Sequence, residues 1–372
     1  MNKESSVQER YSEGARERQA ELCCPVDYNR DLLEIIPDEI LEKDYGCGDP
    51  TRYVQEGDVV LDLGSGSGKI CYMAAQLVGD QGRVIGVDMN DDMLELARSY
   101  QQEMAYKLGS DRVQFLKGKI QDLALDQVAM ENWLEKNPVK DQVSLEKFEA
   151  WKEQQRNTSP LIPDNSVDLV ISNCVLNLVN DNDKQQLVNE IYRVVKPGGR
   201  VAISDIVSDE VVPERLKDDP VLWSGCISGA FQEQEFVESF RKAGFLAVTL
   251  DKWSSEPWKV IDEIEFRSVT LVAHKNEDDE CLDKGHAVIY RGPFSFAMDD
   301  EGHEFPRGER MAVCERTYRL LTGGAYGDVF IGISPAGERE GVKWCAPTGT
   351  TRPAAETRGG KYKNTGKSGG CC

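Results

Sequence analysis

The sequence predicts an α/β protein with a mostly parallel sheet of seven strands, helices on both faces of that sheet, and a small β-rich domain towards the C-terminus. Three observations predict this fold. Short apolar runs alternate with helical segments from Val59 onward, which is typical of chains that build parallel sheets from βαβ units. A glycine-rich loop follows the first apolar run. Beyond an acidic break at residues 276–280 the alternation stops, and glycine and aromatic residues become frequent.

Apolar runs and helix start signals indicate where each element lies. The expected strands are 59–63, 83–88, 113–117, 167–172, 200–205, 247–250 and 266–273. The expected helices are 69–78, 92–108, 183–195 and 232–243. A charged helical stretch, 127–156, interrupts the alternation and is interpreted as a surface insertion.

Four parts are expected along the chain. Residues 1–53 are polar and helical, and residues 54–275 form the sheet domain. Residues 276–346 form the small C-terminal domain, and residues 347–372 are a flexible tail that ends in two cysteines.

Composition excludes several classes of function. The net charge of −21 argues against a nucleic-acid partner, because phosphates are neutralised by Lys and Arg. No run of apolar residues is long enough to span a membrane, and the N-terminus lacks the apolar core of a secretory signal. We therefore expect a cytoplasmic protein, and a monomer, with no membrane partner.

Cysteine and histidine usage indicates which ions the chain suits. The eleven cysteines are an odd number, which fits a disulfide framework poorly. Only three histidines are present, so a soft ion or metalloid would be bound by thiolates rather than imidazoles.

The glycine loop indicates a cofactor site. It spans Asp62–Gly68, and its glycines let the backbone approach a ligand. The acid at its start, Asp62, suits a cationic ligand, and Asp88 ends the next strand, where it can bind a ribose diol. This pattern resembles the class I S-adenosylmethionine methyltransferases. The same loop geometry serves dinucleotides, so NAD binding is the competing interpretation.

Three cysteines are expected at the rim of that site. Cys174 ends the fourth strand, and ligands of open parallel sheets bind at the carboxyl ends of strands. Cys226 lies between glycines after the fifth strand, and Cys47 lies between glycines before the first. Any one of them alone is more simply a buried core thiol. Three around one pocket favour a thiol site.

The motifs around these cysteines resemble the arsenite S-adenosylmethionine methyltransferases. The matching stretches are YGCG at 45–48, DLGSGSG at 62–68, SNCVLNLV at 172–179, LWSGCISGA at 222–230, YRGPFSF at 290–296 and the terminal Gly-Gly-Cys-Cys. The pair Cys23 and Cys24 falls where the family has an N-terminal cysteine. The spacing to Cys47 leaves open which of the two matches it.

The resemblance implies methylation of trivalent arsenic, held by the thiolates of Cys47, Cys174 and Cys226. The cofactor contacts implied by the motif and the family are Tyr45, Gly46, Asp62, Gly64, Ser65, Gly66, Asp88, Met89, Ile120, Gln121 and Asn173. Among them, Asp88 would bind the ribose, Met89 and Ile120 the adenine, and Asn173 the amino-acid end.

Repeated methylation, to mono-, di- or trimethylated arsenic, needs the arsenic reduced between steps. Cys47 with Cys23 or Cys24 would supply two electrons and form a disulfide, which thioredoxin or glutathione would reduce. Cys371 and Cys372 would pick up arsenite, or are merely thiols of a flexible tail. Cys281, Cys314 and Cys345 are interpreted as structural.

Two alternative functions remain at this point. A quinone- or sterol-type methyltransferase would share the glycine loop without needing three thiols. A non-enzymatic, thiol-based metalloid-binding protein would explain the cysteines without the cofactor motif.

Overall fold

The computed structural model describes residues 3–19, 26–277, 280–335, 337, 339–347 and 349–357. The chain divides into two compact units, Met1–Lys275 and Asn276–Cys372. Within the described ranges, no helix has the length and apolar character needed to cross a membrane.

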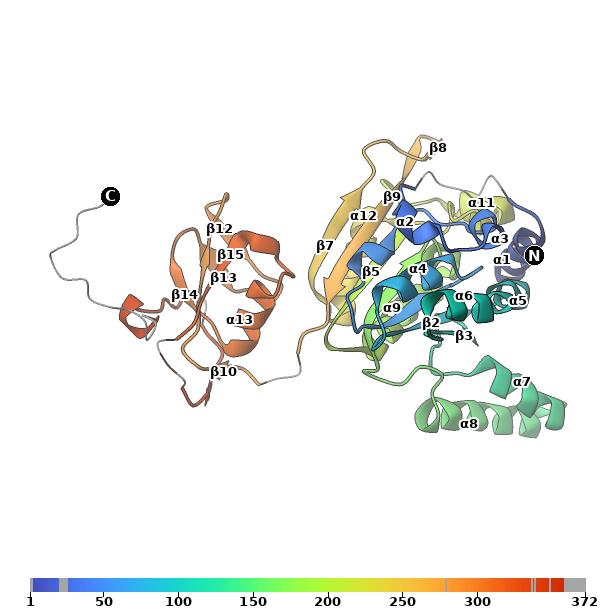
Figure 1. The fold of residues 1–372 in the computed structure, drawn as a ribbon, viewed down its shortest axis with the longest axis horizontal. Helices are drawn as coiled ribbons and strands as arrows, with labels where there is room; N and C mark the ends of the chain where they lie inside the picture. The colour runs from blue at the N-terminus through green and yellow to red at the C-terminus, as the bar shows by residue number, and fades with distance from the viewer. Residues whose placement is uncertain are drawn as a thin grey trace. The chain divides into compact units, whose positions relative to one another are not determined.

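A single mixed sheet organises the first unit (Figure 1). Its strands are β1 Val59–Leu63, β2 Arg83–Asp88, β3 Val113–Lys117, β4 Val167–Asn173, β5 Val195–Ser208, β6 Phe231–Gln232, β7 Leu246–Trp253, β8 Lys259–Ile261 and β9 Ile264–His274. The main path runs β3-β2-β1-β4-β5-β9-β7, in which β1 to β5 are parallel and β9 pairs antiparallel with β5 and β7. The mostly parallel α/β fold is thus confirmed.

The number of strands was underestimated: the sheet has nine strands, not seven. The seven expected strands form the main path. The two additional strands, β6 and β8, have only two and three residues and pair with the ends of β5 and β9. Such short segments carry too few alternating residues for a periodicity to be recognised.

Helices bury apolar residues against both faces of the sheet. On one face lie α4 Lys69–Leu77, α5 Asp91–Ser99 and α6 Gln101–Leu108, whose Tyr72 and Leu94 share a core with Val60 of β1. On the other lie α9 Asp181–Val194 and α12 Glu233–Ala243, whose Leu187 and Phe236 share a core with neighbouring strand residues. This sandwich makes the sheet a rigid base for the loops at its carboxyl edge.

Two expected helices are each divided into two. The helix over 92–108 breaks at Tyr100, between α5 and α6. The insertion consists of α7 Gln127–Lys136 and α8 Gln142–Thr158, separated by a segment that contains Pro138. Proline ends a helix, and Asp141 begins the next one by accepting a hydrogen bond from Ser144 N at 2.7 Å. No described residue of α8 is buried, as expected for a surface insertion.

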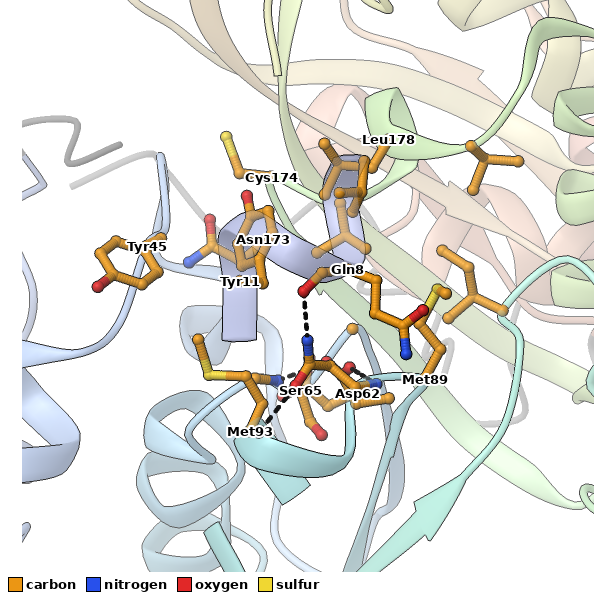
Figure 2. A pocket seen from close by; sticks show the side chains of 18 of the residues that line it. Gln8, Tyr11, Tyr45, Asp62, Ser65, Met89, Met93, Asn173, Cys174 and Leu178 are labelled. Carbon is orange, nitrogen blue, oxygen red and sulfur yellow. Dashed lines mark hydrogen bonds between the residues drawn. The ribbon is translucent and has the colours of Figure 1, made fainter. Parts of the chain in front are cut away.

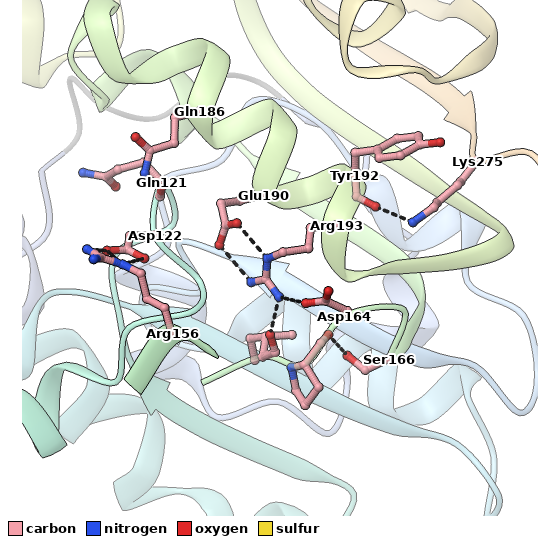
Figure 3. A network of polar contacts seen from close by, with 12 residues as sticks. Gln121, Asp122, Arg156, Asp164, Ser166, Gln186, Glu190, Tyr192, Arg193 and Lys275 are labelled. Carbon is pink, nitrogen blue, oxygen red and sulfur yellow. Dashed lines mark hydrogen bonds and ion pairs between the residues drawn. The ribbon is translucent and has the colours of Figure 1, made fainter. Parts of the chain in front are cut away.

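Polar contacts fix the loop after β3 between the insertion and α9 (Figure 3). The Arg156 guanidinium of α8 pairs with the Asp122 carboxylate at 2.8 Å. Gln186 of α9 donates from Nε2 to the Gln121 carbonyl at 2.8 Å. The loop that carries Gln121 is therefore held on both sides.

The segment before β1 contains α1 Lys3–Arg16, α2 Arg30–Leu33, α3 Asp38–Glu42 and a 3-10 turn at Pro50–Tyr53. After β5 come α10 Glu214–Lys217 and α11 Pro220–Ser224. In Figure 1, α1 lies beside α5 and α11, and contacts between residues of these helices agree with that view.

The second unit is rich in β-structure, as expected. Its elements are β10 Leu282–Asp283, β11 Ala287–Tyr290, β12 Phe296–Met298, β13 Glu304–Pro306, β14 Arg310–Ala312, α13 Glu315–Thr322, β15 Phe330–Ile333 and β16 Val342–Lys343. The strands form a β14-β11-β15 sheet and two two-stranded pairs, β10-β16 and β12-β13. They enclose a core of their own that includes Val288, Phe305 and Leu321.

Candidate active site

A cavity of the first unit lies at the carboxyl ends of β1, β2 and β4. There the sheet order reverses, because β2 pairs on one side of β1 and β4 on the other. Open parallel sheets bind their ligands at this position. Ten of the eleven predicted cofactor residues line this cavity: Tyr45, Asp62, Gly64, Ser65, Gly66, Asp88, Met89, Ile120, Gln121 and Asn173.

The glycine loop after β1 forms the floor of the cavity. Gly64 has a φ of 69°, and a Cβ on it would collide with the side chain of Val175. Glycine is therefore required there for both conformation and space. The Ser65 hydroxyl oxygen is buried on the cavity and has no hydrogen-bond partner among the described residues. A buried polar atom without a partner is rare in a protein, and a ligand would satisfy this one.

Two buried carboxyl groups flank the loop. Asp88 accepts hydrogen bonds from Gly66 N at 2.9 Å and Asn90 N at 2.8 Å, and burial outweighs these bonds and raises its pKa. Asp62 lies deeper, and burial raises its pKa to about 8, although a hydrogen bond from Cys71 at 3.2 Å acts in the opposite direction. Both groups suit a ligand that brings hydroxyls or positive charge.

Helix α1 covers the cavity, which the sequence analysis missed. Val7, Gln8 and Tyr11 line it, and Figure 2 shows Gln8 and Tyr11 on the opposite side from Asp62 and Ser65. The Gln8 carbonyl accepts a hydrogen bond from Asn90 Nδ2 at 3.0 Å. An apolar spacing of four residues, Val7-Tyr11-Ala15, was the available signal of a packed helix face.

The segment Tyr45–Gly48 is held against β4 by Asn173. The Asn173 side-chain oxygen accepts from Cys47 N at 2.8 Å and Gly48 N at 3.0 Å, and its Nδ2 donates to the Gly48 carbonyl at 2.8 Å. The carboxamide we expected to contact the cofactor is thus engaged with this loop. Gly46 does not line the cavity, and a Cβ there would collide with Asn173, so its role is a close backbone approach.

The structure brings Cys47, Cys174 and Cys226 together. All three are reduced, at most 5% exposed, and belong to one apolar cluster with residues such as Ile206 and Phe266. Cys226 Sγ donates to the Cys174 carbonyl at 3.0 Å. The Tyr11 hydroxyl of α1 lies 3.8 Å from Cys226 Sγ, which closes the thiol cluster on the helix side. Cys174 also lines the cavity, so the cluster lies beside it.

Two of these cysteines adopt a left-handed backbone conformation. The φ angles are 64° at Cys174 and 59° at Cys226. For a residue with a Cβ this costs about 1–3 kcal/mol, and such strain is concentrated at functional sites. Glycine would adopt these angles without that cost, which makes Cys174 and Cys226 candidates for a functional role of the side chain.

Asp205 of β5 is a further acid at this site that the sequence analysis missed. One of its carboxylate oxygens and the sulfurs of Cys47 and Cys174 lie within 4.8 Å of one another, a group that does not include Cys226. Burial raises the pKa of Asp205 to about 7, against hydrogen bonds from Ile206 N and Leu176 N. Leu176 is two residues from Cys174, so Asp205 also anchors the segment that carries this thiol.

The predicted relay cysteines Cys23 and Cys24, and the terminal Cys371 and Cys372, lie outside the described residues.

Comparison with known proteins identifies the family. An arsenite methyltransferase of Aquipseudomonas alcaligenes is 33% identical to this chain over 317 residues, which are 80% of the chain and 81% of that protein. An arsenite methyltransferase of Homo sapiens is 32% identical over 322 residues, 83% of the chain and 76% of that protein. The chain belongs to the arsenite methyltransferase family. The resemblance found in the motifs is thus confirmed, and the chain is an S-adenosylmethionine-dependent methyltransferase.

Family models and solved structures agree with membership in the arsenite methyltransferase family. A model described as "Methyltransferase domain" matches residues 54–149 and 142–244. The crystal structure of an arsenic(III) S-adenosylmethionine methyltransferase from Chlamydomonas reinhardtii matches with a TM-score of 0.54 and 30% identity, covering 86% of this chain and all of that one. Residues 277–362 match a model described as "Domain of unknown function (DUF8838)".

Proposed function

We propose that this chain transfers methyl groups from S-adenosylmethionine to trivalent arsenic, which the thiolates of Cys47, Cys174 and Cys226 hold. The observation that carries the proposal is the cluster of three buried cysteines, without a disulfide among the described residues, beside the cofactor cavity that Cys174 lines. Trivalent arsenic is soft and prefers thiolates, and an apolar wall protects such a complex from water.

The cavity residues fit S-adenosylmethionine. The cofactor is cationic at its sulfonium, and the buried acids Asp62 and Asp88 and the unpartnered Ser65 hydroxyl are suited to its charge and hydroxyl groups. Asp88 would accept from the ribose, while Met89 and Ile120 would contact the adenine. Gln121, on the loop that Gln186 holds, completes the adenine side.

The chemistry requires positioning rather than proton transfer. When bound, S-adenosylmethionine supplies a methyl group that the arsenic lone pair takes, and the carbon–sulfur bonding pair stays with the sulfur. Three thiolates leave arsenic with one lone pair, and the three cysteines would hold the arsenic in place for the transfer. The nucleophile carries no proton, so no general base is needed, which suits a site without histidine among its described lining residues.

Repeated turnover needs two electrons per methyl group, because methylation formally converts trivalent arsenic to pentavalent. Cys47 with Cys23 or Cys24 would give up two electrons and two protons and form a disulfide. Thioredoxin or glutathione would then reduce that disulfide. The same cycle, repeated on a methylated arsenic, extends the products from mono- to di- and trimethylated species.

The remaining features follow from this function. The substrates would be arsenite and methylarsenite or their thiol conjugates, and the enzyme would act as a cytoplasmic monomer in arsenic detoxification. Residues 1–53 would carry the relay thiols, residues 54–275 the cofactor and arsenic sites, and residues 276–346 a separate domain before the tail 347–372.

The test is an incubation with S-adenosylmethionine, arsenite and excess thiol, with arsenic species separated over time. The wild type should form methylated arsenic. Cys174→Ser should lose at least about a hundredfold in rate while still binding the cofactor, since misplacing a reacting atom has costs of this size. Asn132→Ala, at an exposed position of α7, is the control and should retain the wild-type rate. Cofactor binding without any methylated arsenic would instead favour a quinone- or sterol-type acceptor.

A further inference from the structure

Three cysteines of the second unit surround a cavity that the proposed reaction does not use. Cys281, Cys314 and Cys345 all line it, together with polar groups that include Glu301, His303 and Arg316. The three thiols are reduced. They come from positions 281, 314 and 345 of the sequence, so the fold, not the local chain, brings them together.

Backbone pairing places two of these thiols side by side. Strands β10 and β16 are antiparallel, with Leu282 opposite Lys343. The pairing continues beyond the strands, because Trp344 N donates to the Cys281 carbonyl at 2.8 Å. Cys281 therefore lies opposite Trp344, the residue before Cys345, and the Cys281 and Cys345 thiols are hydrogen-bonded to each other.

The third thiol arrives from helix α13. Cys314 is its N-cap, and Cys314 Sγ accepts a hydrogen bond from Thr317 N at 3.4 Å. The helix dipole favours negative charge on that sulfur. Burial, a hydrogen bond to the Cys345 thiol and the nearby Cys314 together raise the pKa of Cys281. Cys281 therefore contacts both other thiols, although the three sulfurs do not all lie within 4.8 Å of one another.

Glu301, His303 and Arg316 of this cavity each have an ion-pair partner. Arg316 pairs with Glu301 at 2.5 Å, and His303 Nδ1 pairs with Asp299 at 2.8 Å. Asp299, Glu301 and His303 form a group of their own within 4.8 Å. A zinc ion would require a fourth ligand besides the three thiols, whereas trivalent arsenic is complete with three.

We propose that Cys281, Cys314 and Cys345 form a second binding site for trivalent arsenic, in the second unit of the chain. The choice of arsenic as the ion rests on the proposed function. Cys314 is buried, Cys281 is half-buried and Cys345 is exposed, so the ion enters at Cys345 and is enclosed at Cys314. All three cysteines lie within the segment that matches the domain of unknown function.

Arsenite binding at this site requires neither an oxidant nor a reductant. Arsenite, As(OH)₃, exchanges its three hydroxyl groups for three cysteine sulfurs. Each thiol proton leaves with one hydroxyl as water, so three waters form and arsenic stays trivalent. The high pKa of the Cys281 thiol is no obstacle, because the proton departs in the water.

The test is the number of arsenic atoms bound by the intact chain, measured by native mass spectrometry with arsenite and without S-adenosylmethionine. The background is the full chain with Cys23, Cys24, Cys371 and Cys372 replaced by Ser, which leaves the two described clusters and Cys71. We expect two arsenic atoms bound. In this background, Cys345→Ser, Cys314→Ser and Cys174→Ser should each bind one arsenic atom. Methylation is measured in the chain that retains Cys23 and Cys24, where Cys345→Ser and Cys314→Ser should still methylate arsenic and Cys174→Ser should not.

The outcomes separate this proposal from the proposed function. A background that binds one arsenic atom, lost in Cys174→Ser, would overturn the second site and leave the active site intact. If the background binds one arsenic atom and Cys345→Ser loses it, the second site stands and arsenic binding at the active site is overturned. Cys314 is buried and Cys345 is exposed. If the Cys314→Ser protein misfolds, the result for Cys345→Ser therefore decides whether the second site exists. One equivalent of zinc in the protein as purified, released on thiol modification, would overturn the choice of arsenic.

Discussion

At the scale of single residues, Asn173 connects the glycine-flanked loop to the sheet. Its side chain makes three hydrogen bonds to the backbone of Cys47 and Gly48 and a fourth to the Tyr28 hydroxyl at 3.2 Å. Asn173→Ala leaves buried backbone groups without partners, which costs about 1–3 kcal/mol per group. We expect the variant to lose at least about 2 kcal/mol of unfolding free energy and to raise the KM for arsenite.

Urea denaturation and steady-state kinetics check this prediction. Asn132→Ala, at an exposed position of α7, is the matched control and should change stability by less than about 0.5 kcal/mol. An Asn173→Ala protein as stable as this control would contradict the anchoring role.

Asp62 should make stability depend on pH. Burial raises its pKa to about 8 from an ordinary value of 3.8. Because the pKa of Asp62 is higher in the folded state than in the unfolded state, the contribution of Asp62 to the unfolding free energy is fully present below about pH 4. That contribution is lost as the pH rises through about 8. Asp62→Asn stays neutral, so its stability relative to the wild type should increase with pH across this window, by up to about 1.4 kcal/mol per pH unit.

The measurement is urea unfolding of both proteins at several pH values between about 5 and 8, where the linkage acts. Asp218→Asn, at an exposed position, should run parallel to the wild type. A difference between Asp62→Asn and wild type that does not change with pH would show that Asp62 is already ionised in the folded protein.

At the scale of elements, α1 reaches the site because it packs on helices that lie far from it in the sequence. It packs on α5 and α11 through contacts such as Arg10 Nη1 to the Val221 carbonyl at 2.9 Å. A chain lacking residues 1–16 should fold, because the sheet core lies elsewhere, but should bind S-adenosylmethionine about tenfold more weakly, or 1.4 kcal/mol. Calorimetric titration measures the Kd for S-adenosylmethionine.

Arg16→Ala, at an exposed position of α1, is the control. An unchanged Kd in the truncated chain would show that α1 does not cover the bound cofactor.

The elements also show what could be predicted from the sequence. Strands β1, β2 and β3 were predicted to the residue, because each is a short buried run between turn signals. The split at Tyr100 and the short strand β6 were not, because neither leaves a periodic pattern. Cys47, Cys174 and Cys226 could be placed at one rim from topology alone. The covering role of Tyr11 and the position of Asp205 could not, because each depends on packing between segments far apart in the sequence.

At the scale of the whole molecule, the two units should fold independently. The described lining of the cofactor cavity and the three-thiol cluster belong to the first unit, and the second has its own core around Phe305. A chain ending at Lys275 should bind S-adenosylmethionine with a Kd within about threefold of the full chain, a difference of less than 1 kcal/mol. Calorimetric titration of both proteins, with circular dichroism to confirm folding, checks this. Insolubility, or complete loss of binding, would show that the second unit is required for the first.

The central claim is that one arsenic atom is held by three sulfurs beside the cofactor cavity. X-ray absorption at the arsenic edge tests it most directly. The sample is the full chain with every cysteine except Cys47, Cys71, Cys174 and Cys226 replaced by Ser, loaded with one equivalent of arsenite. We predict three sulfur neighbours and no oxygen. Two sulfurs and one oxygen would contradict the three-thiolate site and would indicate that Asp205, within 4.8 Å of Cys47 and Cys174, binds in place of Cys226.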